Sequence, residues 1–189
     1  MIRNILRKIV KSLLSLYRWQ IYIIKYHKAP PPVHTTIEAK GLKVHIGSGN
    51  IDLKGWINID GRDFDHIHIV SDNLDLNEFS NNAISEIYMC HIIEHVSFAD
   101  VENIFRQFYK KLSVGGVLRI SVPDFRVIAD VYCKYGDIDL IKHPLMGGQD
   151  YSYNFHKSIF DYDSIKSLFE FSGYKEVERW TTEMDFGGA

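Results

Sequence analysis

The sequence is poor in cysteine and proline and contains no long apolar run. Two cysteines, Cys90 and Cys133, occur among 189 residues, so neither a disulfide framework nor a cysteine-based zinc site is expected. No apolar stretch reaches the roughly 18 residues that suggest a transmembrane helix. No apolar segment with a small-residue cleavage site marks a signal peptide. These absences favour the reducing cytoplasm as the location.

Acidic and basic residues nearly balance, with a net charge of -2, which gives no reason to expect a nucleic-acid partner. The N-terminus is the exception, because residues 1–28 hold seven of the 22 basic residues and none of the 24 acidic ones. Apolar residues that begin with Ile2, Ile5 and Leu6 recur at helical spacing and predict a basic amphipathic helix over residues 2–24. The segment APPPV then ends the helix and forms a stiff linker.

The chain therefore divides into a helix and linker, residues 1–32, and one domain, residues 33–189. The basic helix has two interpretations. It packs on its own domain or on a partner subunit, or it lies on an anionic membrane face through residues 1–28. The oligomeric state does not follow from the sequence.

From residue 42 onward, short apolar strands alternate with helical stretches. This order predicts a Rossmann-like, doubly wound, mostly parallel α/β sheet with helices on both faces. One helix is expected to begin with Ser97 as its N-cap and to end before Gly115 and Gly116. A later helix is expected between Asp161 or Asp163 and Gly173. The expected strands are LKVHIG, GWINID, HIHIV, ISEIYMC, VLRISV and YKEVERW.

A glycine turn, Gly47-Ser48-Gly49, follows the first expected strand. Glycines there let the backbone approach a ligand closely. The fingerprint of nicotinamide dinucleotide binding is incomplete, because Asp52 stands where a third glycine is needed. The acid that ends the second strand, Asp60, follows the turn by 11 residues, whereas that fingerprint places it about 20 residues on. Asp60 can accept bonds from ribose hydroxyls, or it is a solvated turn acid.

The third strand ends in SDNLDL. Asp72 could accept a bond from an adenine amine, with Asp75 as a competitor, and Asn73 has a usable backbone N–H. Alternatively, these residues only form a turn, which aspartate, asparagine and serine favour.

The stretch HIIEH, His91 to His95, matches the pattern of an inverted zinc peptidase. That interpretation needs a metal-binding helix and a third ligand. A strand-like segment precedes His91, a break follows His95, and no third ligand stands out in the sequence. The zinc hydrolase is therefore disfavoured, and we expect no metal.

Four segments, taken together and in order, resemble the class I S-adenosylmethionine-dependent methyltransferases, and most closely the small type-11-like domains of bacterial surface-polysaccharide clusters. The resemblance covers roughly residues 42–180. It implies a seven-stranded sheet with S-adenosylmethionine across the carboxyl ends of the first strands. The C-terminal TTEMDFGGA is a poor strand, so the chain is truncated or the sheet lacks its antiparallel edge strand. The segments are VHIGSGNIDLKGWINID, YMCHIIEH, KKLSVGGVLRISVPDF and GGQDYSYNFHKSIFDYDSIKSLFEFSGY.

The resemblance also assigns roles to residues. The segment VPDF, with Asp124, matches the rim of the substrate side, and HIIEH becomes one wall of the cofactor cleft. Within that stretch, Glu94 is expected to be structural, and His95 faces either the acceptor or the core. The positions that match the family's cofactor site are Gly47, Ser48, Gly49, Asp60, Asp72, Asn73, Met89, Cys90 and His91.

A second polar cluster, GGQDYSYNFHKSIF, combines aromatic rings, which suit sugars, with side chains that suit hydroxyls. We expect a hydroxyl acceptor, for which a histidine base is suitable. His156 is the first candidate for the base and His95 the second. The substrate-side candidates are Asp124, Gln149, Tyr153, Asn154 and Lys157. The cluster could also be no more than a well hydrogen-bonded surface loop.

The resemblance thus implies a methyltransferase, and its hypothetical reaction is O-methylation of a surface glycan or of its lipid-linked precursor. The protein would be cytoplasmic, at the inner membrane face if the basic helix binds lipid. The alternative is a noncatalytic module with the same fold, which docks a glycan-assembly complex through its basic helix.

Overall fold

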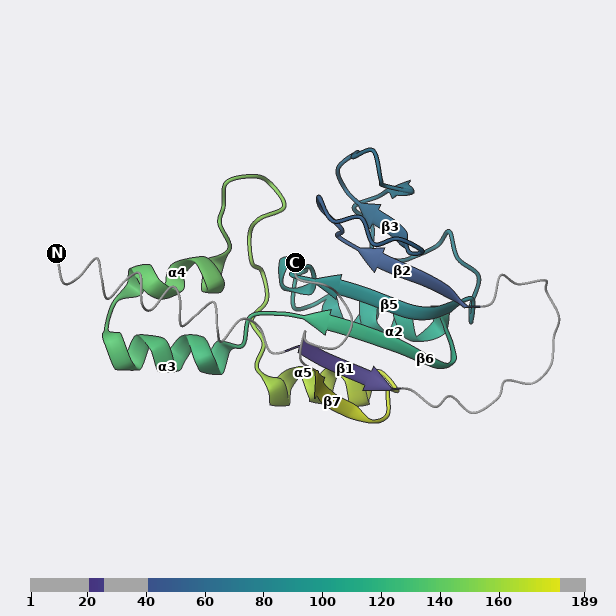
Figure 1. The fold of residues 1–189 in the computed structure, drawn as a ribbon. Helices are drawn as coiled ribbons and strands as arrows, with labels where there is room; N and C mark the ends of the chain where they lie inside the picture. Colours follow the sequence, from purple (N-terminus) through teal and green to yellow (C-terminus); the bar gives the residue numbers. More distant parts are fainter. Residues whose placement is uncertain (1–20, 26–40, 181–189) are drawn as a thin grey trace.

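The computed structural model describes residues 21–25 and 41–180. A seven-stranded sheet with the order β4-β3-β2-β5-β6-β1-β7 forms its centre (Figure 1). The strands are β1 (Ile21–Lys25), β2 (Leu42–Ile46), β3 (Ile57–Asp60), β4 (Ile69–Val70), β5 (Ile84–Cys90), β6 (Leu112–Ser121) and β7 (Val177–Trp180).

The strands β4, β3, β2, β5 and β6 run parallel to one another. The chain first builds outward from β2 to β3 and β4, and then crosses to the other side of β2 for β5 and β6. The order therefore reverses between β2 and β5, which are hydrogen-bonded neighbours. In open parallel sheets, ligands bind at such a reversal, outside the carboxyl ends of the strands.

Strand β1 corrects two expectations from the sequence. It lies between β6 and β7 and is antiparallel to both, so residues 21–24 form a strand and not the end of a helix. Three isoleucines and a tyrosine favour this extended conformation. The predicted helix otherwise falls on residues 1–20, outside the described residues. The sheet also contains an antiparallel strand, supplied by the N-terminal part of the chain, but this strand lies between β6 and β7 and not at the edge.

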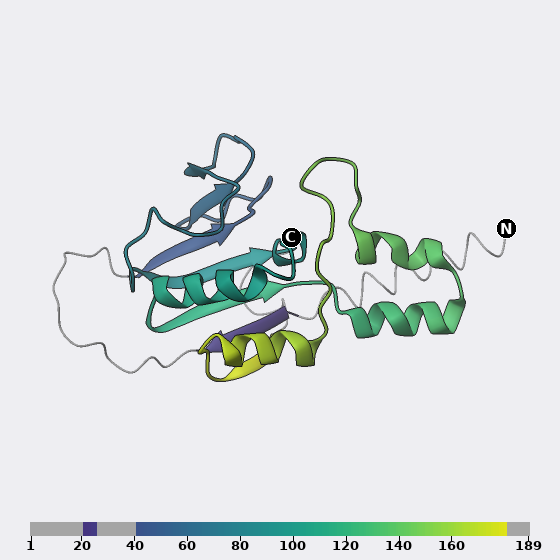
Figure 2. The ribbon, with the colours of Figure 1, turned by 180° about the vertical axis from the view of Figure 1, so that it is seen from behind.

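Two helices, α2 (Val101–Lys111) and α5 (Tyr162–Phe171), cover the same face of the sheet (Figures 1 and 2). Phe105 and Phe108 of α2 and Phe169 of α5 are fully buried there with Tyr174. Helices on both faces were expected. Within the described residues, however, the connections from β2 to β3 and from β3 to β4 contain no helix.

The boundaries of α2 differ from the prediction. Asp100, and not Ser97, occupies the N-cap position, and it makes no side-chain capping bond. The helix ends at Lys111, whose ammonium donates to the Phe79 carbonyl at 2.7 Å. Gly115 and Gly116 lie inside β6, beside the irregularity in its register with β5.

The later helix, α5, was predicted correctly. Asp161 is its N-cap and accepts from the backbone N–H of Ser164, whose side chain in turn accepts from the Asp161 backbone. This reciprocal capping box satisfies two N–H groups that the first turn leaves open. Gly173 follows the helix with a φ of 103°.

Two further helices, α3 (Phe125–Tyr135) and α4 (Ile138–Met146), form a hairpin beyond the carboxyl end of β6 (Figure 1). The sequence contained their signals. Asp124 caps α3, left-handed Gly136 ends it, and Asp137 caps α4. The hairpin has a small apolar centre of its own around Ile128 and Leu140. No helix among the described residues is long and apolar enough to cross a membrane.

Candidate functional site

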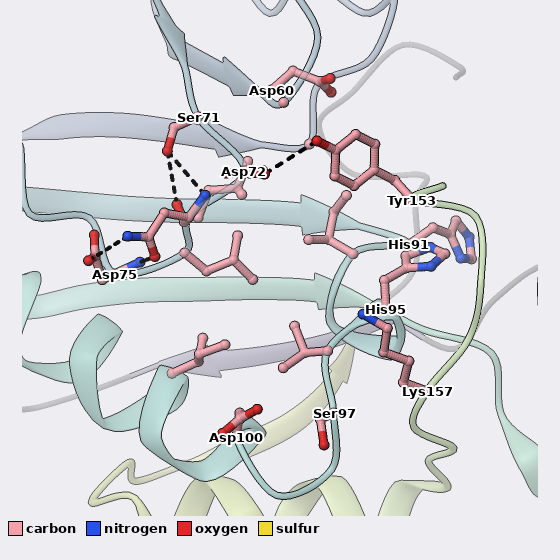
Figure 3. Close-up of a pocket in the computed structure, with 18 of the residues that line it drawn as sticks. Asp60, Ser71, Asp72, Asp75, His91, His95, Ser97, Asp100, Tyr153 and Lys157 are labelled. Atoms are coloured by element: carbon pink, nitrogen blue, oxygen red, sulfur yellow. Dashed lines mark hydrogen bonds between the residues drawn. The ribbon is translucent and has the colours of Figure 1, made fainter. Parts of the chain in front are cut away.

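A cavity of about 960 Å³ lies at the carboxyl ends of the strands around the reversal of the sheet. Figure 3 shows side chains that converge on it from the segments after several different strands. Gly47 follows β2, Asp60 ends β3, Asp72 follows β4, and Cys90 and His91 lie at the end of β5. A cavity of this size is within the usual range for cofactor and small-ligand sites.

Gly47 is the first residue of the turn after β2 and lines the cavity. Its φ is 66°, in the left-handed region, and a Cβ built on it would lie 1.8 Å from the Ile92 Cδ1 atom. The N–H groups of Gly47 and Ser48 both donate to the Ile59 carbonyl of β3, at 2.8 and 3.1 Å. Only glycine fits this position, because the turn is left-handed and Ile92 occupies the space that a side chain would need.

Asp60 ties the glycine turn to the next loop. Its Oδ2 accepts from the Gly49 N–H at 2.8 Å. Its Oδ1 accepts from the Arg62 backbone N–H at 2.9 Å and from Arg62 Nε at 3.2 Å. A carboxylate has about four acceptor positions, so these three bonds leave room for one more donor, on Oδ2. With Arg62 in this position, Asp60 can therefore accept one ligand hydroxyl instead of the two expected.

Ser48 and Gly49 do not line the cavity. Ser48 is buried, and its hydroxyl has no hydrogen-bond partner among the described residues. The Gly49 N–H is occupied by Asp60. The two residues shape the turn, while Gly47 forms the wall.

The loop after β4 lies at the cavity and is also held together as a turn. Asp72, Asn73 and Asp75 all line the cavity. The Asn73 N–H donates to Ser71 Oγ at 3.1 Å, and the Asn73 side chain donates to Asp75 at 2.7 Å. Asp72 instead accepts from the Tyr153 hydroxyl at 3.3 Å (Figure 3). Asn73 and Asp75 therefore build the turn, and Asp72 bonds to Tyr153 of the segment between α4 and α5.

The end of β5 carries a charged pair. His91 has a φ of 58°, and its Nδ1 lies 2.8 Å from Glu94 Oε1. Burial opposes the charged imidazolium, but hydrogen bonds to Cys90 and Glu94 outweigh it and raise the pKa of His91 to about 10. Burial raises the pKa of the Cys90 thiol, but the charge of His91 and hydrogen bonds to His91, Ser121 and Tyr88 together outweigh burial and lower this pKa. Met89, by contrast, is fully buried in the core.

His95 lines the cavity, and its ring contacts the ring of His156 at a centroid distance of 4.9 Å. His95 Nδ1 lies 3.1 Å from the Phe155 carbonyl and donates to it. His156 is half-buried beside the cavity and does not line it. Burial lowers the pKa of His156, and the Glu94 charge partly opposes this. The two base candidates are thus neighbours.

The segment between α4 and α5 closes one side of the cavity. Tyr153 and Lys157 line it, whereas Gln149 and Asn154 hold the loop together. The Gln149 N–H donates to the Asn154 carbonyl at 2.9 Å, and a Cβ on Gly147 would lie 2.4 Å from that same carbonyl. Asp124 lies outside the cavity lining too, as the N-cap that accepts from Arg126 at 2.9 Å.

The structure adds lining residues that the sequence analysis did not select. Asp100 is the N-cap of α2, and Asn103 and Gln107 lie in the first two turns of that helix. Their spacing of three and four places them on one helix face, and that polar strip was the signal in the sequence. Other additions come from loops and had no comparable pattern; these are Arg62, Ser71, Ser97 and Tyr151.

No protein-family model matches the chain, and no curated protein matches it. Its fold is similar to that of an S-adenosylmethionine-dependent methyltransferase from Archaeoglobus fulgidus. The TM-score is 0.51 and the sequence identity 16%, and the match covers 90% of this chain and 70% of that one. At this identity the likeness shows the fold alone.

Two other solved structures are less similar. An S-adenosylmethionine-dependent methyltransferase from Thermotoga maritima has a TM-score of 0.49 and 16% identity, over 72% of this chain and 65% of that one. A complex of the Trm112 methyltransferase activator with a methyltransferase from Haloferax volcanii has a TM-score of 0.46 and 14% identity, over 72% of this chain and 62% of that one. Neither match carries a functional argument.

Proposed function

We propose that the protein is an S-adenosylmethionine-dependent methyltransferase. The observation that carries this proposal is the position of the cavity, at the reversal of a parallel sheet whose solved counterpart is a methyltransferase. Gly47, Asp60 and Asp72 reach this cavity from three successive strands of the sheet. These three residues are among the nine cofactor candidates that the sequence analysis gave.

The residues present suit this cofactor. Gly47 leaves space for a ligand to approach the backbone, Asp60 Oδ2 can accept a ribose hydroxyl, and Asp72 can accept from an adenine amine. Cys90 and His91 line the part of the cavity next to β5 and would contact the methionine part. When bound, the cofactor would supply an activated methyl group on a cationic sulfonium.

The chain itself must align the acceptor and exclude water. His95 lies in the cavity wall and His156 lies behind it, so a hydroxyl presented at this wall would have a histidine within reach. Tyr151, Tyr153 and Phe155 are exposed in the same segment. Aromatic rings of this kind suit the faces of sugars, which supports a glycan or a lipid-linked saccharide as the acceptor.

The proposed location is the cytoplasm, at the inner membrane face if the basic N-terminal residues contact anionic lipid. Their charge supports this part of the proposal. Deletion of residues 1–20 leaves β1 in the chain, and it should reduce co-sedimentation with anionic liposomes. Unchanged co-sedimentation would remove the membrane contact from the proposal.

Calorimetry with S-adenosylhomocysteine tests the cofactor site first. The wild-type chain should bind, and Asp60→Ala should bind much more weakly. Asp63→Ala is the matched control, because Asp63 is an exposed carboxylate on the same loop and does not line the cavity. Absence of binding in the wild type at millimolar ligand would refute the proposal.

The competing function is a noncatalytic module that docks a glycan-assembly complex. It would dock through the basic N-terminal residues 1–28, which carry seven of the 22 basic residues and no acidic one. Methyl transfer to a panel of saccharide and lipid-linked acceptors separates the two. Cofactor binding without turnover on any acceptor would favour the module.

A further inference from the structure

A second group of side chains meets at the edge of the cavity. Glu94, His95 and His156 each offer one ligand atom, and these atoms lie within 4.8 Å of one another. Glu94 and His95 belong to the short 3-10 helix η1 (Ile93–His95) after β5. His156 comes from the segment between α4 and α5, about sixty residues further along the chain.

The Glu94 carboxylate is the first sign that this group binds a cation. Glu94 is only 1% exposed. Its Oε1 is paired with His91 Nδ1 at 2.8 Å, but its Oε2 is buried with no hydrogen-bond partner in the described part of the chain. A buried carboxylate oxygen is costly unless a donor or a cation satisfies it. Glu94 therefore combines an unsatisfied carboxylate oxygen with a position beside the two histidines.

A neutral histidine ring carries one nitrogen lone pair that can bind a cation. His95 donates its Nδ1–H to the Phe155 carbonyl at 3.1 Å, so the other ring nitrogen of the neutral imidazole carries a lone pair. Histidines that ligate metals are typically oriented in this way, by a carbonyl that binds the second ring nitrogen. The His156 ring lies against the His95 ring, with the two ring centroids 4.9 Å apart.

The backbone holds the contributing segments together. The Glu94 carbonyl accepts from the N–H groups of Lys157 and Ser158, at 2.8 and 3.0 Å. The His156 N–H donates to the Met146 carbonyl at 3.1 Å. Ligand atoms about 2.1 Å from one ion stand roughly 3.0–3.4 Å apart. Rotation of the two partly exposed histidine rings would have to close the separation of at most 4.8 Å by about 1.4–1.8 Å to reach that spacing.

We infer that Glu94, His95 and His156 bind a divalent first-row transition-metal ion, with zinc as the best match. Two imidazole nitrogens and one carboxylate oxygen are ligands that suit zinc and its neighbours in the series better than magnesium. Three protein ligands leave a position open for an outside oxygen. Because His95 lines the cavity, the ion would lie at the cavity wall.

The role of the ion rests on the proposed function. An acceptor hydroxyl in the open position would become more acidic, because a bound cation favours the deprotonated oxygen. The hydroxyl proton would leave to solvent as the oxygen forms its bond to the methyl carbon and the carbon–sulfur bond breaks. His95 and His156 would then hold the ion and would not act as bases.

Cobalt(II) is the probe for the test, because its visible absorption reports the ligands and geometry of a site of this type. The full chain, with any affinity tag removed, is stripped with a chelator and titrated with cobalt(II), and zinc is then added as a competitor. We expect one equivalent to bind and zinc to displace it. Magnesium at the same concentration should not displace it.

Variants identify the ligands. His95→Ala and His156→Ala should each weaken cobalt(II) binding at least about tenfold, the lower end of the losses seen even for residues behind the ligands. His143→Ala is the matched control, an exposed histidine on α4, and it should bind as the wild type does. Glu94→Gln keeps the size of the buried side chain and should also weaken binding.

Several results would overturn the inference. These are binding no tighter than millimolar in the wild type, binding unchanged in both histidine variants, or a thiolate-to-cobalt charge-transfer band, which would assign the ion to Cys90. S-adenosylhomocysteine binding is measured on the same samples. Cobalt(II) binding without cofactor binding would contradict the proposed function alone, whereas cofactor binding without cobalt(II) binding would contradict only the metal site.

Discussion

Replacement of Gly47 by alanine tests the central feature of the site, the turn after β2. Gly47 has a φ of 66°, and a new Cβ would lie 1.8 Å from Ile92 Cδ1 and 2.4 Å from Ile92 Cγ1. Real Cβ atoms do not approach other atoms so closely, so either Ile92 or the turn must move. Both form part of the cavity wall.

The expected cost has two parts. A left-handed alanine costs about 1 kcal/mol after the smaller freedom of its unfolded chain is counted. Overpacking against Ile92 adds about 1–3 kcal/mol. The sum is about 2–4 kcal/mol in the free energy of unfolding. For a chain of this size, that corresponds to a melting temperature lower by about 5–15 °C.

Thermal unfolding and calorimetry with S-adenosylhomocysteine measure the two consequences of Gly47→Ala. Gly136→Ala is the matched control, because Gly136 has a similar φ of 59° and a Cβ added there would meet no atom within 4 Å. It should lose only the backbone part, about 1 kcal/mol, and should bind the ligand normally. Gly47→Ala should bind it about tenfold more weakly or worse, a loss of about 1.4 kcal/mol.

Two results would refute this reasoning. One is a Gly47→Ala protein that is as stable as Gly136→Ala and binds the ligand normally. The other is a double-mutant cycle with Ile92→Ala that shows no coupling, because relief of the contact should recover part of the loss.

Three further predictions concern acid stability, the cavity mouth and the thiols. Burial lowers the pKa of His45 from 6.5 to about 4, so the unfolded chain takes up a proton at a higher pH than the folded chain does. The free energy of unfolding should therefore fall by roughly 3 kcal/mol from pH 6.5 to 4. In urea titrations, His45→Gln should make this free energy depend less on pH. Tyr153→Phe removes the hydroxyl that donates to Asp72. In stopped flow, S-adenosylhomocysteine should associate faster with this variant, and the free energy of unfolding should stay within about 0.5 kcal/mol of the wild-type value. An unchanged association rate would contradict a role for this contact in closing the cavity. Cys90 lines the cavity, so saturating S-adenosylhomocysteine should protect it from iodoacetamide. Exposed Cys133 should react at the same rate with and without the ligand, as measured by peptide mass spectrometry. Equal protection of both thiols would be inconsistent with the site.

Local signals predicted the parallel part of the fold well. The strand ISEIYMC corresponds to β5 residue for residue, and Asp161 and Gly173 bound α5 as expected. These elements carry their own signals, namely an apolar run, a capping side chain and a left-handed glycine. The α3–α4 hairpin had equivalent signals in Asp124 and Gly136, although no helix was predicted there.

The N-terminal strand shows the limit of local signals. Residues 21–25 continue a helical pattern of apolar residues, but they are equally rich in side chains that favour strands. Their conformation is decided by β6 and β7, which flank them in the sheet. Hydrogen bonds to strands about a hundred and a hundred and fifty residues away leave no trace in the local pattern.

In the candidate site, too, some features follow from local sequence signals and others from long-range contacts. The sequence by itself determined where β2, β3, β4 and β5 end, and therefore that Gly47, Asp60, Asp72 and His91 would meet at one edge of a parallel sheet. Only the tertiary structure decided what surrounds them, because those contacts join residues far apart in the chain. Tyr153 reaches Asp72 across 81 positions. HIIEH lacked a third ligand in the sequence, and the fold brings His156 beside Glu94 and His95.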